Sequence, residues 1–175
     1  LITLFTISAC FQENNKAVTN TVKSASLNEQ TVSVSNVTDN TAQLPLLEVY
    51  KSPTCSCCEK WLEHIDQHGF TSKAHNQIDL STFKTDKGIA PQYRSCHTAV
   101  SKEGYVFEGH VPAKFIHQFL AKPPVNAIGL SVPAMPIGTP GMEVGDKFIP
   151  YKVILLMADG SYGVYAELNN YQEQF

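Results

Sequence analysis

Hydrophobic and polar residues are distributed differently on the two sides of residue 44. Residues 11–44 are dominated by Asn, Thr, Ser, Gln and Val, show no clean periodicity and carry no aromatic residue after Phe11. Such a segment buries too little apolar surface to offset the entropy lost on ordering, so we predict a flexible tether over 11–44. The alternation in TVSVSNV leaves a short edge strand as the alternative.

Residues 45–175 carry the patterns of a folded domain. The apolar run LPLLEVYKS, residues 44–52, is bounded by prolines and predicts a buried strand. In the following segment Trp61, Leu62 and Ile65 share one face of a predicted helix that stops at Gly69. A second strand is predicted over 72–78, and a short helix over 80–88 that is closed by Gly88.

The second half of this domain predicts two hairpins separated by a helix and a loop. Residues 97–112 form two alternating runs around a Lys-Glu-Gly turn, and residues 151–168 form two more around Asp159-Gly160, with Met157 in the core. A helix is predicted over 112–122, with Pro112 in its first turn. The Pro/Gly-rich stretch 123–150 is predicted to be irregular. This order of elements predicts an α/β domain with a central mixed sheet, close to a thioredoxin-like fold with an extra C-terminal β-hairpin.

Composition and charge exclude several classes of function. The 175 residues are 43% hydrophobic and have a formal net charge of −3. Because the sequence contains no block of Lys and Arg, it lacks the electrostatic footprint of a nucleic-acid-binding protein. No stretch approaches the roughly 20 apolar residues that a membrane-spanning helix needs.

The first ten residues have the character of a targeting segment. LITLFTISAC is apolar and uncharged and ends in Ile7-Ser8-Ala9-Cys10. An apolar run that closes on small residues is typical of a secretory signal, and a Cys at its end is typical of a lipoprotein signal. We therefore expect residues 1–10 to be a signal-peptide remnant, Cys10 to be lipidated, and the protein to act in the periplasm. The alternative is an ordinary N-terminal strand or helix with an incidental Cys.

Three of the five cysteines lie in four positions, at Cys55, Cys57 and Cys58. They fall where the first predicted strand passes into the first predicted helix, and the positive end of a helix dipole lowers thiol pKa values. Thiolates are the nucleophiles of disulfide exchange and also soft ligands for Cu(I) or zinc. A redox pair needs only two cysteines, so the third thiol favours metal binding.

Cys96 offers a fourth sulfur at the head of a predicted strand. In a thioredoxin-like sheet this strand start lies beside the first strand-helix turn, so we expect Cys96 to complete a cluster with the other three. Thiol-disulfide exchange by Cys55 and Cys58 stays open as an alternative, as does a structural disulfide between Cys96 and either Cys55 or Cys57.

Histidines and methionines are candidate additional ligands. His110 precedes a predicted helix at a strand end, where side chains converge on sites. His97 follows Cys96 and is expected on the opposite face of its strand, which argues against it as a direct ligand. The other histidines are expected to face solvent or to be satisfied by hydrogen bonds. Met135 and Met142 lie in the Pro/Gly-rich loop, either as thioether ligands for Cu(I) or as flexible fillers that anchor the loop.

Four separated segments, PTCSCCEKW, SCHTA, EGHVP and VPAMPIGTPGM, resemble the CopG-type periplasmic metal-binding proteins, also known as domain-of-unknown-function family 411. The resemblance runs in order from about Val49 to Tyr165. Two positions depart from the family pattern. Ser56 replaces the glycine of CGCC, and Ala134 replaces a glycine of the loop, where glycine supplies a positive φ.

The resemblance implies a thioredoxin-like fold and a role in copper resistance. It further implies a copper-binding cluster of Cys55, Cys57, Cys58 and Cys96, with redox interconversion of Cu(I) and Cu(II). Four sulfurs hold more than one ion only by sharing, so a polynuclear Cu(I) cluster is expected, and zinc is the alternative metal. The partners that fit this role are copper ions and a copper exporter or periplasmic copper chaperone. Membrane contact is expected only through the lipid anchor.

Overall fold

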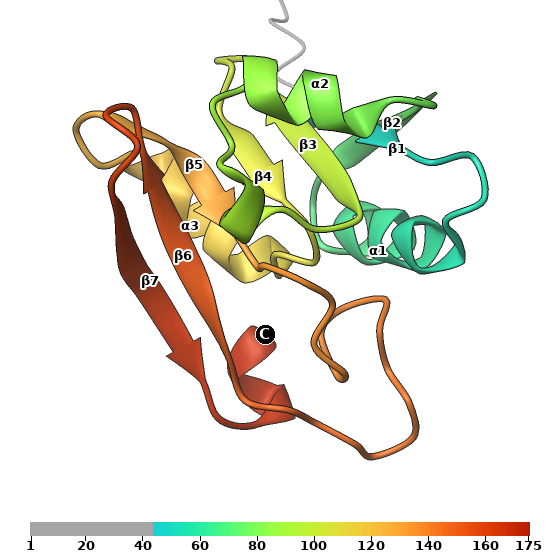
Figure 1. Cartoon of the computed structure of the whole chain (residues 1–175). Coiled ribbons are helices and arrows are strands. Elements are labelled where there is room, and N and C mark those ends of the chain that lie inside the picture. Colours follow the sequence, from blue (N-terminus) through green and yellow to red (C-terminus); the bar gives the residue numbers. More distant parts are fainter. Residues whose placement is uncertain (1–43) are drawn as a thin grey trace, which may run out of the picture. The chain divides into compact units, whose positions relative to one another are not determined.

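The computed structural model describes residues 44–175, so the predicted signal remnant with Cys10 and the predicted tether up to residue 43 lie outside the described residues. Within 44–175 the chain forms seven strands, three α-helices and two short 3₁₀ turns (Figure 1). The elements are β1 (Leu46–Lys51), α1 (Ser56–Gln67), β2 (Thr71–Asn76), α2 (Leu80–Asp86), a 3₁₀ turn (Pro91–Tyr93), β3 (His97–Ser101), β4 (Val106–Glu108), α3 (Ala113–Ala121), β5 (Ala127–Ser131), β6 (Tyr151–Met157), β7 (Tyr162–Leu168) and a second 3₁₀ turn (Tyr171–Gln174).

All seven strands belong to one mixed sheet in the order β2-β1-β3-β4-β5-β6-β7. The pairs β1–β2 and β4–β5 are parallel, and the other neighbours are antiparallel. The domain is therefore a mixed α/β structure. The antiparallel register of β1 with β3 places Lys51 opposite His97, so the end of β1 and the start of β3 lie side by side.

Apolar side chains pack on both faces of the sheet. Ala99 and Phe107 belong to the cluster that α1 and α3 cover, whereas their neighbours Val100 and Val106 belong to the cluster beside α2. Successive strand residues point to opposite faces, which explains this separation. Helix α2 accordingly lies on one side of the sheet, and α1 and α3 on the other (Figure 1).

Helix α1 forms because its apolar residues repeat at helical spacing. Cys58, Trp61, Leu62 and Ile65 are its buried residues, and they face the sheet. Cys55 is the N-cap residue and makes no side-chain capping hydrogen bond. Two of the three clustered cysteines thus lie in the first helical turn, not in the preceding connection.

Three local expectations prove wrong. The stretch 123–150 is not irregular throughout, because Ala127–Ser131 form β5 in the interior of the sheet. This strand holds Gly129 so close to β4 that an added Cβ would lie 1.8 Å from the Val106 carbonyl oxygen. Pro112 is the N-cap of α3 and not part of its first turn. Met157, expected in the core, is only half-buried.

Within residues 44–175, no helix combines the length and the apolar character that crossing a bilayer requires.

Candidate metal centre

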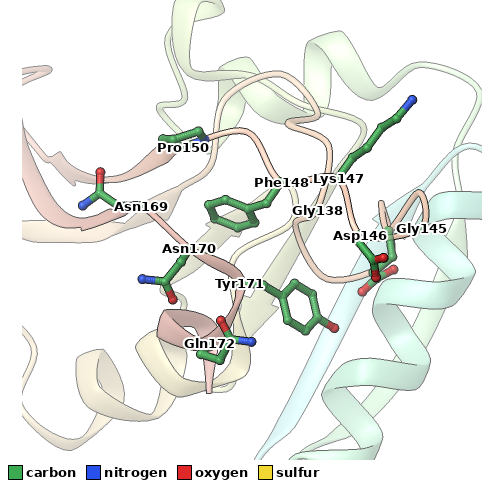
Figure 2. A pocket seen from close by; sticks show the side chains of 11 residues that line it. Gly138, Gly145, Asp146, Lys147, Phe148, Pro150, Asn169, Asn170, Tyr171 and Gln172 are labelled. Carbon is green, nitrogen blue, oxygen red and sulfur yellow. The ribbon is translucent and has the colours of Figure 1, made fainter.

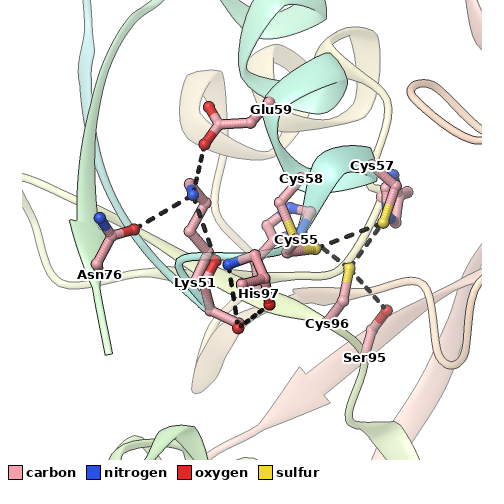
Figure 3. Close-up of a disulfide and its surroundings, with 12 residues drawn as sticks. Lys51, Cys55, Cys57, Cys58, Glu59, Asn76, Ser95, Cys96 and His97 are labelled. Carbon is pink, nitrogen blue, oxygen red and sulfur yellow. Dashed lines mark hydrogen bonds and ion pairs between the residues drawn. A yellow bond between two sulfur atoms is a disulfide. The ribbon is translucent and has the colours of Figure 1, made fainter. Parts of the chain in front are cut away.

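The start of α1 gathers three sulfurs. Cys55 and Cys58 form a disulfide with a Cα–Cα distance of 5.3 Å (Figure 3). The sulfur of Cys57 lies 3.5 Å from that of Cys55. Cys58 is buried, whereas Cys55 and Cys57 are partly exposed. The sulfurs are therefore reachable from solvent on the Cys57 side.

Cys96 brings the fourth sulfur from a segment that lies 38 residues after Cys58 in the sequence. It immediately precedes β3, whose first residue pairs with the last residue of β1. The sulfurs of Cys55, Cys57, Cys58 and Cys96 all lie within 4.8 Å of one another. Among residues 44–175, Cys57 and Cys96 are the free thiols, so the structure does not contain the alternative disulfide to Cys96.

Two buried histidines also adjoin Cys96. The Cys96 sulfur lies 3.1 Å from Nε2 of His110 and 3.2 Å from Nδ1 of His97. These three ligand atoms lie within 4.8 Å of one another, and both histidines are fully buried. The expectation that His97 points away from Cys96 is therefore wrong. Side-chain alternation applies within β3, but Cys96 lies before the strand begins.

A backbone contact fixes the orientation of His110. Its Nδ1 donates a hydrogen bond to the Pro140 carbonyl oxygen at 2.7 Å, which leaves Nε2 without a proton and facing Cys96. Metal-binding histidines typically hold their second ring nitrogen in this way. The His97 ring packs against Trp61, with ring centroids 4.3 Å apart, and the Trp61 indole N–H donates to the Val111 carbonyl oxygen.

Burial keeps this part of the site uncharged. It raises the pKa of the Cys96 thiol to about 12, and the neighbouring Cys57 adds to the shift. Burial also lowers the pKa of His97 far below its ordinary value, with His110 contributing, and it lowers the pKa of His110. Near neutral pH the two imidazoles therefore offer free lone pairs, and a metal must displace the Cys96 proton. On sequence grounds, the helix dipole is expected to lower the thiol pKa values of the CSCC segment. In the structure Cys55 and Cys58 form a disulfide, so these two residues carry no thiol to which that expectation could apply.

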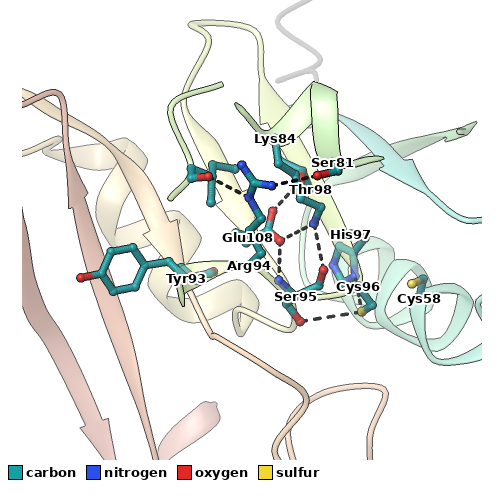
Figure 4. A network of polar contacts seen from close by, with 12 residues as sticks. Cys58, Ser81, Lys84, Tyr93, Arg94, Ser95, Cys96, His97, Thr98 and Glu108 are labelled. Atoms are coloured by element: carbon teal, nitrogen blue, oxygen red, sulfur yellow. Dashed lines mark hydrogen bonds and ion pairs between the residues drawn. The ribbon is translucent and has the colours of Figure 1, made fainter. Parts of the chain in front are cut away.

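A buried polar network holds the backbone next to Cys96 (Figure 4). The Glu108 carboxylate accepts hydrogen bonds from the Lys84 ammonium, from the Ser95 backbone N–H at 2.6 Å and from the Thr98 hydroxyl at 2.5 Å. Lys84 also donates to the Ser95 carbonyl oxygen at 2.9 Å. Burial raises the pKa of Glu108, although Lys84 opposes this shift. Sequence analysis missed the network, whose only signal was an acidic residue among apolar neighbours in β4.

A second buried lysine ties the cysteine turn to the sheet. Lys51, the last residue of β1, is 1% exposed and forms a 2.5 Å ion pair with Glu59 in the first turn of α1. Its ammonium also donates to the Asn76 side-chain oxygen and to the Ser52 carbonyl oxygen, both at 3.3 Å (Figure 3). These contacts fix the start of α1 relative to β1 and β2.

The loop between β5 and β6 closes over the start of α1. Gly141 packs so tightly there that an added Cβ would lie 2.8 Å from the Cys57 carbonyl oxygen and 2.8 Å from the Trp61 backbone nitrogen. Ala134 keeps the positive φ, at 58°, that a glycine would adopt without strain. The Ser95 hydroxyl donates to its carbonyl oxygen. Met135 on this loop is 48% exposed and Met142 is half-buried, and their role as ligands stays a prediction.

The remaining histidines make hydrogen bonds away from the sulfurs. His64 Nε2 accepts from the Ala113 backbone N–H at 3.2 Å, and His68 Nδ1 donates to the His64 carbonyl oxygen at 2.7 Å. His117 Nε2 donates to the His68 carbonyl oxygen at 2.8 Å, and His75 pairs with Glu48. Each of them is therefore satisfied without a metal.

A hollow of about 700 Å³ lies between residues 143–150 and 169–172, with Phe148 and Tyr171 on its walls (Figure 2). None of the described residues that line it is a cysteine or histidine. The candidate chemistry is thus carried by the sulfur and imidazole cluster and not by this hollow.

The chain is similar to known proteins both in sequence and in fold. A family model described as a protein of unknown function, DUF411, matches residues 93–142, which include Cys96, His97, His110 and Met142. Two solved structures of the copper resistance protein CopG, form 1 and form 2, each superpose with a TM-score of 0.68 at 36% sequence identity. They cover 72% of this chain and 98% and 99% of their own chains. The chain belongs to the CopG-type DUF411 family. No curated protein matched the sequence.

Membership of the CopG-type family supports a copper-related role for this chain, because a copper-resistance relative and four clustered cysteines point the same way.

Proposed function

We propose that this protein binds Cu(I) through Cys55, Cys57, Cys58 and Cys96 and serves copper resistance in the bacterial periplasm. The observation that carries the proposal is that four sulfurs from two chain segments lie within 4.8 Å of one another. Thiolate sulfur is a soft ligand and suits Cu(I). Four sulfurs this close can bridge several ions, which a single disulfide exchange reaction does not require.

Copper loading in this proposal begins with reduction of the Cys55–Cys58 disulfide. Two electrons and two protons from a thiol reductant convert the disulfide to two thiols. Each Cu(I) that then binds a thiol sulfur displaces its proton to solvent. With all four sulfurs available the cluster holds more than one ion, and His110, Met135 and Met142 are peripheral donors.

The finer parts of the proposal concern fold and location. We interpret the domain as thioredoxin-like, with α1 following β1 and presenting cysteines at its N-terminus, and with β6 and β7 as an added hairpin. We place the protein in the periplasm, anchored through a lipid on Cys10. A copper exporter or a periplasmic copper chaperone is the proposed partner, and interconversion of Cu(I) and Cu(II) is the proposed redox activity.

Anaerobic titration of the reduced protein with Cu(I), against a weak competing chelator, tests the proposal. We expect more than one Cu(I) per chain, and fewer in Cys57→Ser and in Cys96→Ser. Retention of no copper against the chelator would remove the proposal. A zinc titration under the same conditions decides between the two metals.

The Cys55–Cys58 disulfide favours a second candidate, a thiol-disulfide oxidoreductase. A disulfide at the N-terminus of a helix has the placement of an exchange-active pair, because the helix dipole stabilises the leaving thiolate. This candidate predicts that Cys57→Ser and Cys96→Ser keep the capacity to reduce insulin. The copper proposal predicts instead that both variants lose bound Cu(I).

A further inference from the structure

The hollow between residues 143–150 and 169–172 has no part in the proposed function, because no cysteine or histidine is among the described residues that line it. Its volume of about 700 Å³ falls in the range of small-molecule sites, roughly 300–1,000 Å³. The end of the loop before β6 forms one wall, and the segment after β7 forms the other (Figure 2). Two segments far apart in the sequence therefore enclose a space of the size that a small ligand needs.

A buried glutamine holds the two walls together. Gln174 is 1% exposed, and its Nε2 donates to the Gly138 carbonyl oxygen at 3.0 Å, while its Oε1 accepts from the Tyr151 hydroxyl at 2.7 Å. The Glu173 carboxylate accepts from the Asn169 backbone N–H at 2.6 Å and so fixes the second wall. The hollow is thus ordered before any ligand enters, which lowers the entropy cost of binding.

Two aromatic rings line the hollow, one from each wall. Phe148 is half-buried and packs against Tyr151, with ring centroids 5.8 Å apart. Tyr171 is 39% exposed and packs against Phe175, with centroids 5.3 Å apart. Each ring extends from its own segment toward the other one (Figure 2). The face of an aromatic ring is negative, so it attracts the weakly positive C–H groups of a sugar ring.

The polar groups of the lining offer hydrogen-bond donors and acceptors together. Asn169, Asn170 and Gln172 contribute carboxamides, which both donate and accept. Glu143 and Asp146 contribute carboxylates, which only accept when ionised. Hydroxyl groups also donate and accept, so a ligand that carries several hydroxyls matches this mixture.

We propose that this hollow binds a neutral saccharide, with a sugar ring packed against Phe148 and Tyr171 and its hydroxyls bonded to the surrounding amides and carboxylates. Stacking on the two rings and hydrogen bonding to the polar lining act on different sides of the same ligand. The proposal is independent of copper binding, because it uses none of the sulfurs or imidazoles of the metal centre.

Other classes of ligand match the lining less well. An anion would meet two carboxylates, and Lys147 directs its ammonium away from the two aromatic rings (Figure 2). An apolar ligand would take from the polar lining the hydrogen bonds that it makes to water. An organic cation would suit the rings and the carboxylates but would leave the amide N–H donors unused.

Isothermal titration calorimetry of the full, metal-free chain with cellobiose, maltose and N,N′-diacetylchitobiose tests the proposal. We expect at least one of these disaccharides to bind with a dissociation constant of about 1 mM or lower. Tyr171→Ala should weaken this binding about tenfold or more, because it removes an aromatic contact surface. Tyr162→Ala removes an exposed ring from β7 instead and should bind as the wild type does. Binding of none of the three, or equal binding by Tyr171→Ala and the wild type, would overturn the proposal.

Amide chemical shifts of the isotope-labelled wild type locate the bound sugar without relying on a variant that folds. Shifts concentrated in residues 143–150 and 169–172 support the site, and shifts confined to another surface contradict it. Argininamide serves as the probe for an organic cation. Tighter binding of argininamide than of every disaccharide would assign the hollow to cations and also contradict the proposal.

A free sugar and a sugar chain share this chemistry, and ligand length separates them. A hexasaccharide that binds no more tightly than its disaccharide identifies a site for free sugars, whereas several-fold tighter binding identifies a site for a chain. Cys57→Ser and Cys96→Ser should keep saccharide binding, and Tyr171→Ala should keep Cu(I) binding. Failure of the saccharide site is therefore distinguishable from failure of the proposed copper function.

Discussion

The ammonium group of Lys84 contacts the carboxylate of Glu108 in the protein interior, where the two residues are 3% and 0% exposed. Both groups also bind the backbone of Ser95, the residue before Cys96. The ion pair thus links α2 and β4 to the segment that carries the fourth sulfur. Its role is structural, because it fixes where Cys96 enters the site.

Replacing Lys84 by methionine should lower the free energy of unfolding by about 3–5 kcal/mol, because the Glu108 charge would remain buried without its partner. Denaturant unfolding of the metal-free protein measures this loss. The exposed pair Lys152–Glu167, at 2.8 Å, supplies the control. Lys152→Met should change stability by no more than about 1 kcal/mol. Equal losses in the two variants would contradict a structural role for the buried pair.

Substitution of Gly141 by alanine should destabilise the loop over α1. The added Cβ would lie 2.8 Å from the Cys57 carbonyl oxygen, and we expect a loss of about 1–3 kcal/mol from overpacking. Gly145→Ala is the matched control, because Gly145 also has a positive φ but has open space around its Cα. Thermal unfolding should show a clearly larger loss for Gly141→Ala. The same loss at both sites would mean that backbone strain alone decides the outcome.

Ala134→Gly should stabilise the protein. Ala134 has a φ of 58°, and left-handed backbone costs an L-residue about 1–2 kcal/mol. Glycine removes that strain but adds freedom to the unfolded chain, so we expect a net gain of roughly 0.5–1 kcal/mol. Ala121→Gly, at the end of α3, should instead lower stability. A loss of stability in Ala134→Gly, measured by denaturant unfolding, would show that the strain is relieved in another way.

Acidification from about pH 6.5 to pH 4 should lower the free energy of unfolding, because His64 becomes protonated over this range. Burial, with a contribution from His68, lowers the pKa of His64 from 6.5 to about 4. A histidine with a depressed folded pKa contributes stability above its unfolded pKa and loses it as pH falls through the folded one. Protonation also removes the acceptor for the Ala113 N–H at the start of α3. Because the ring is partly exposed, we expect a loss of about 1–2 kcal/mol.

His64→Gln keeps a hydrogen-bond acceptor and does not titrate. Unfolding measured across this pH range should therefore fall less steeply for His64→Gln than for the wild type. Parallel curves for the two proteins would assign the acid sensitivity to other groups.

Sequence patterns located the elements that carry their own local signal. The apolar run before Cys55, the helical face of Trp61 and Ile65, and the two alternating runs around Gly104 all predicted elements that the structure contains. The strand β5 escaped detection, because five residues with a glycine at the centre give no periodicity. Its position depends on pairing with β4 and β6, which no local pattern records.

The candidate site divides in the same way. Cys55, Cys57, Cys58 and Cys96 could be grouped from spacing and an expected strand order. His97 was discounted because strand alternation was applied one residue too early. Lys84 and Glu108 could not be paired from sequence, because 24 positions separate them and only the packing of α2 against the sheet brings them together.

The pairing of Lys51 with His97 across β1 and β3 has a further consequence. The cysteines of CSCC are close together in any conformation of the chain, because they are neighbours in the sequence. Cys96 and the imidazoles of His97 and His110 come close to them only once β1 and β3 have paired. Under the proposed function, an unfolded molecule would bind copper through the neighbouring sulfurs of CSCC alone. The number of ions bound per molecule would then report whether the sheet has formed.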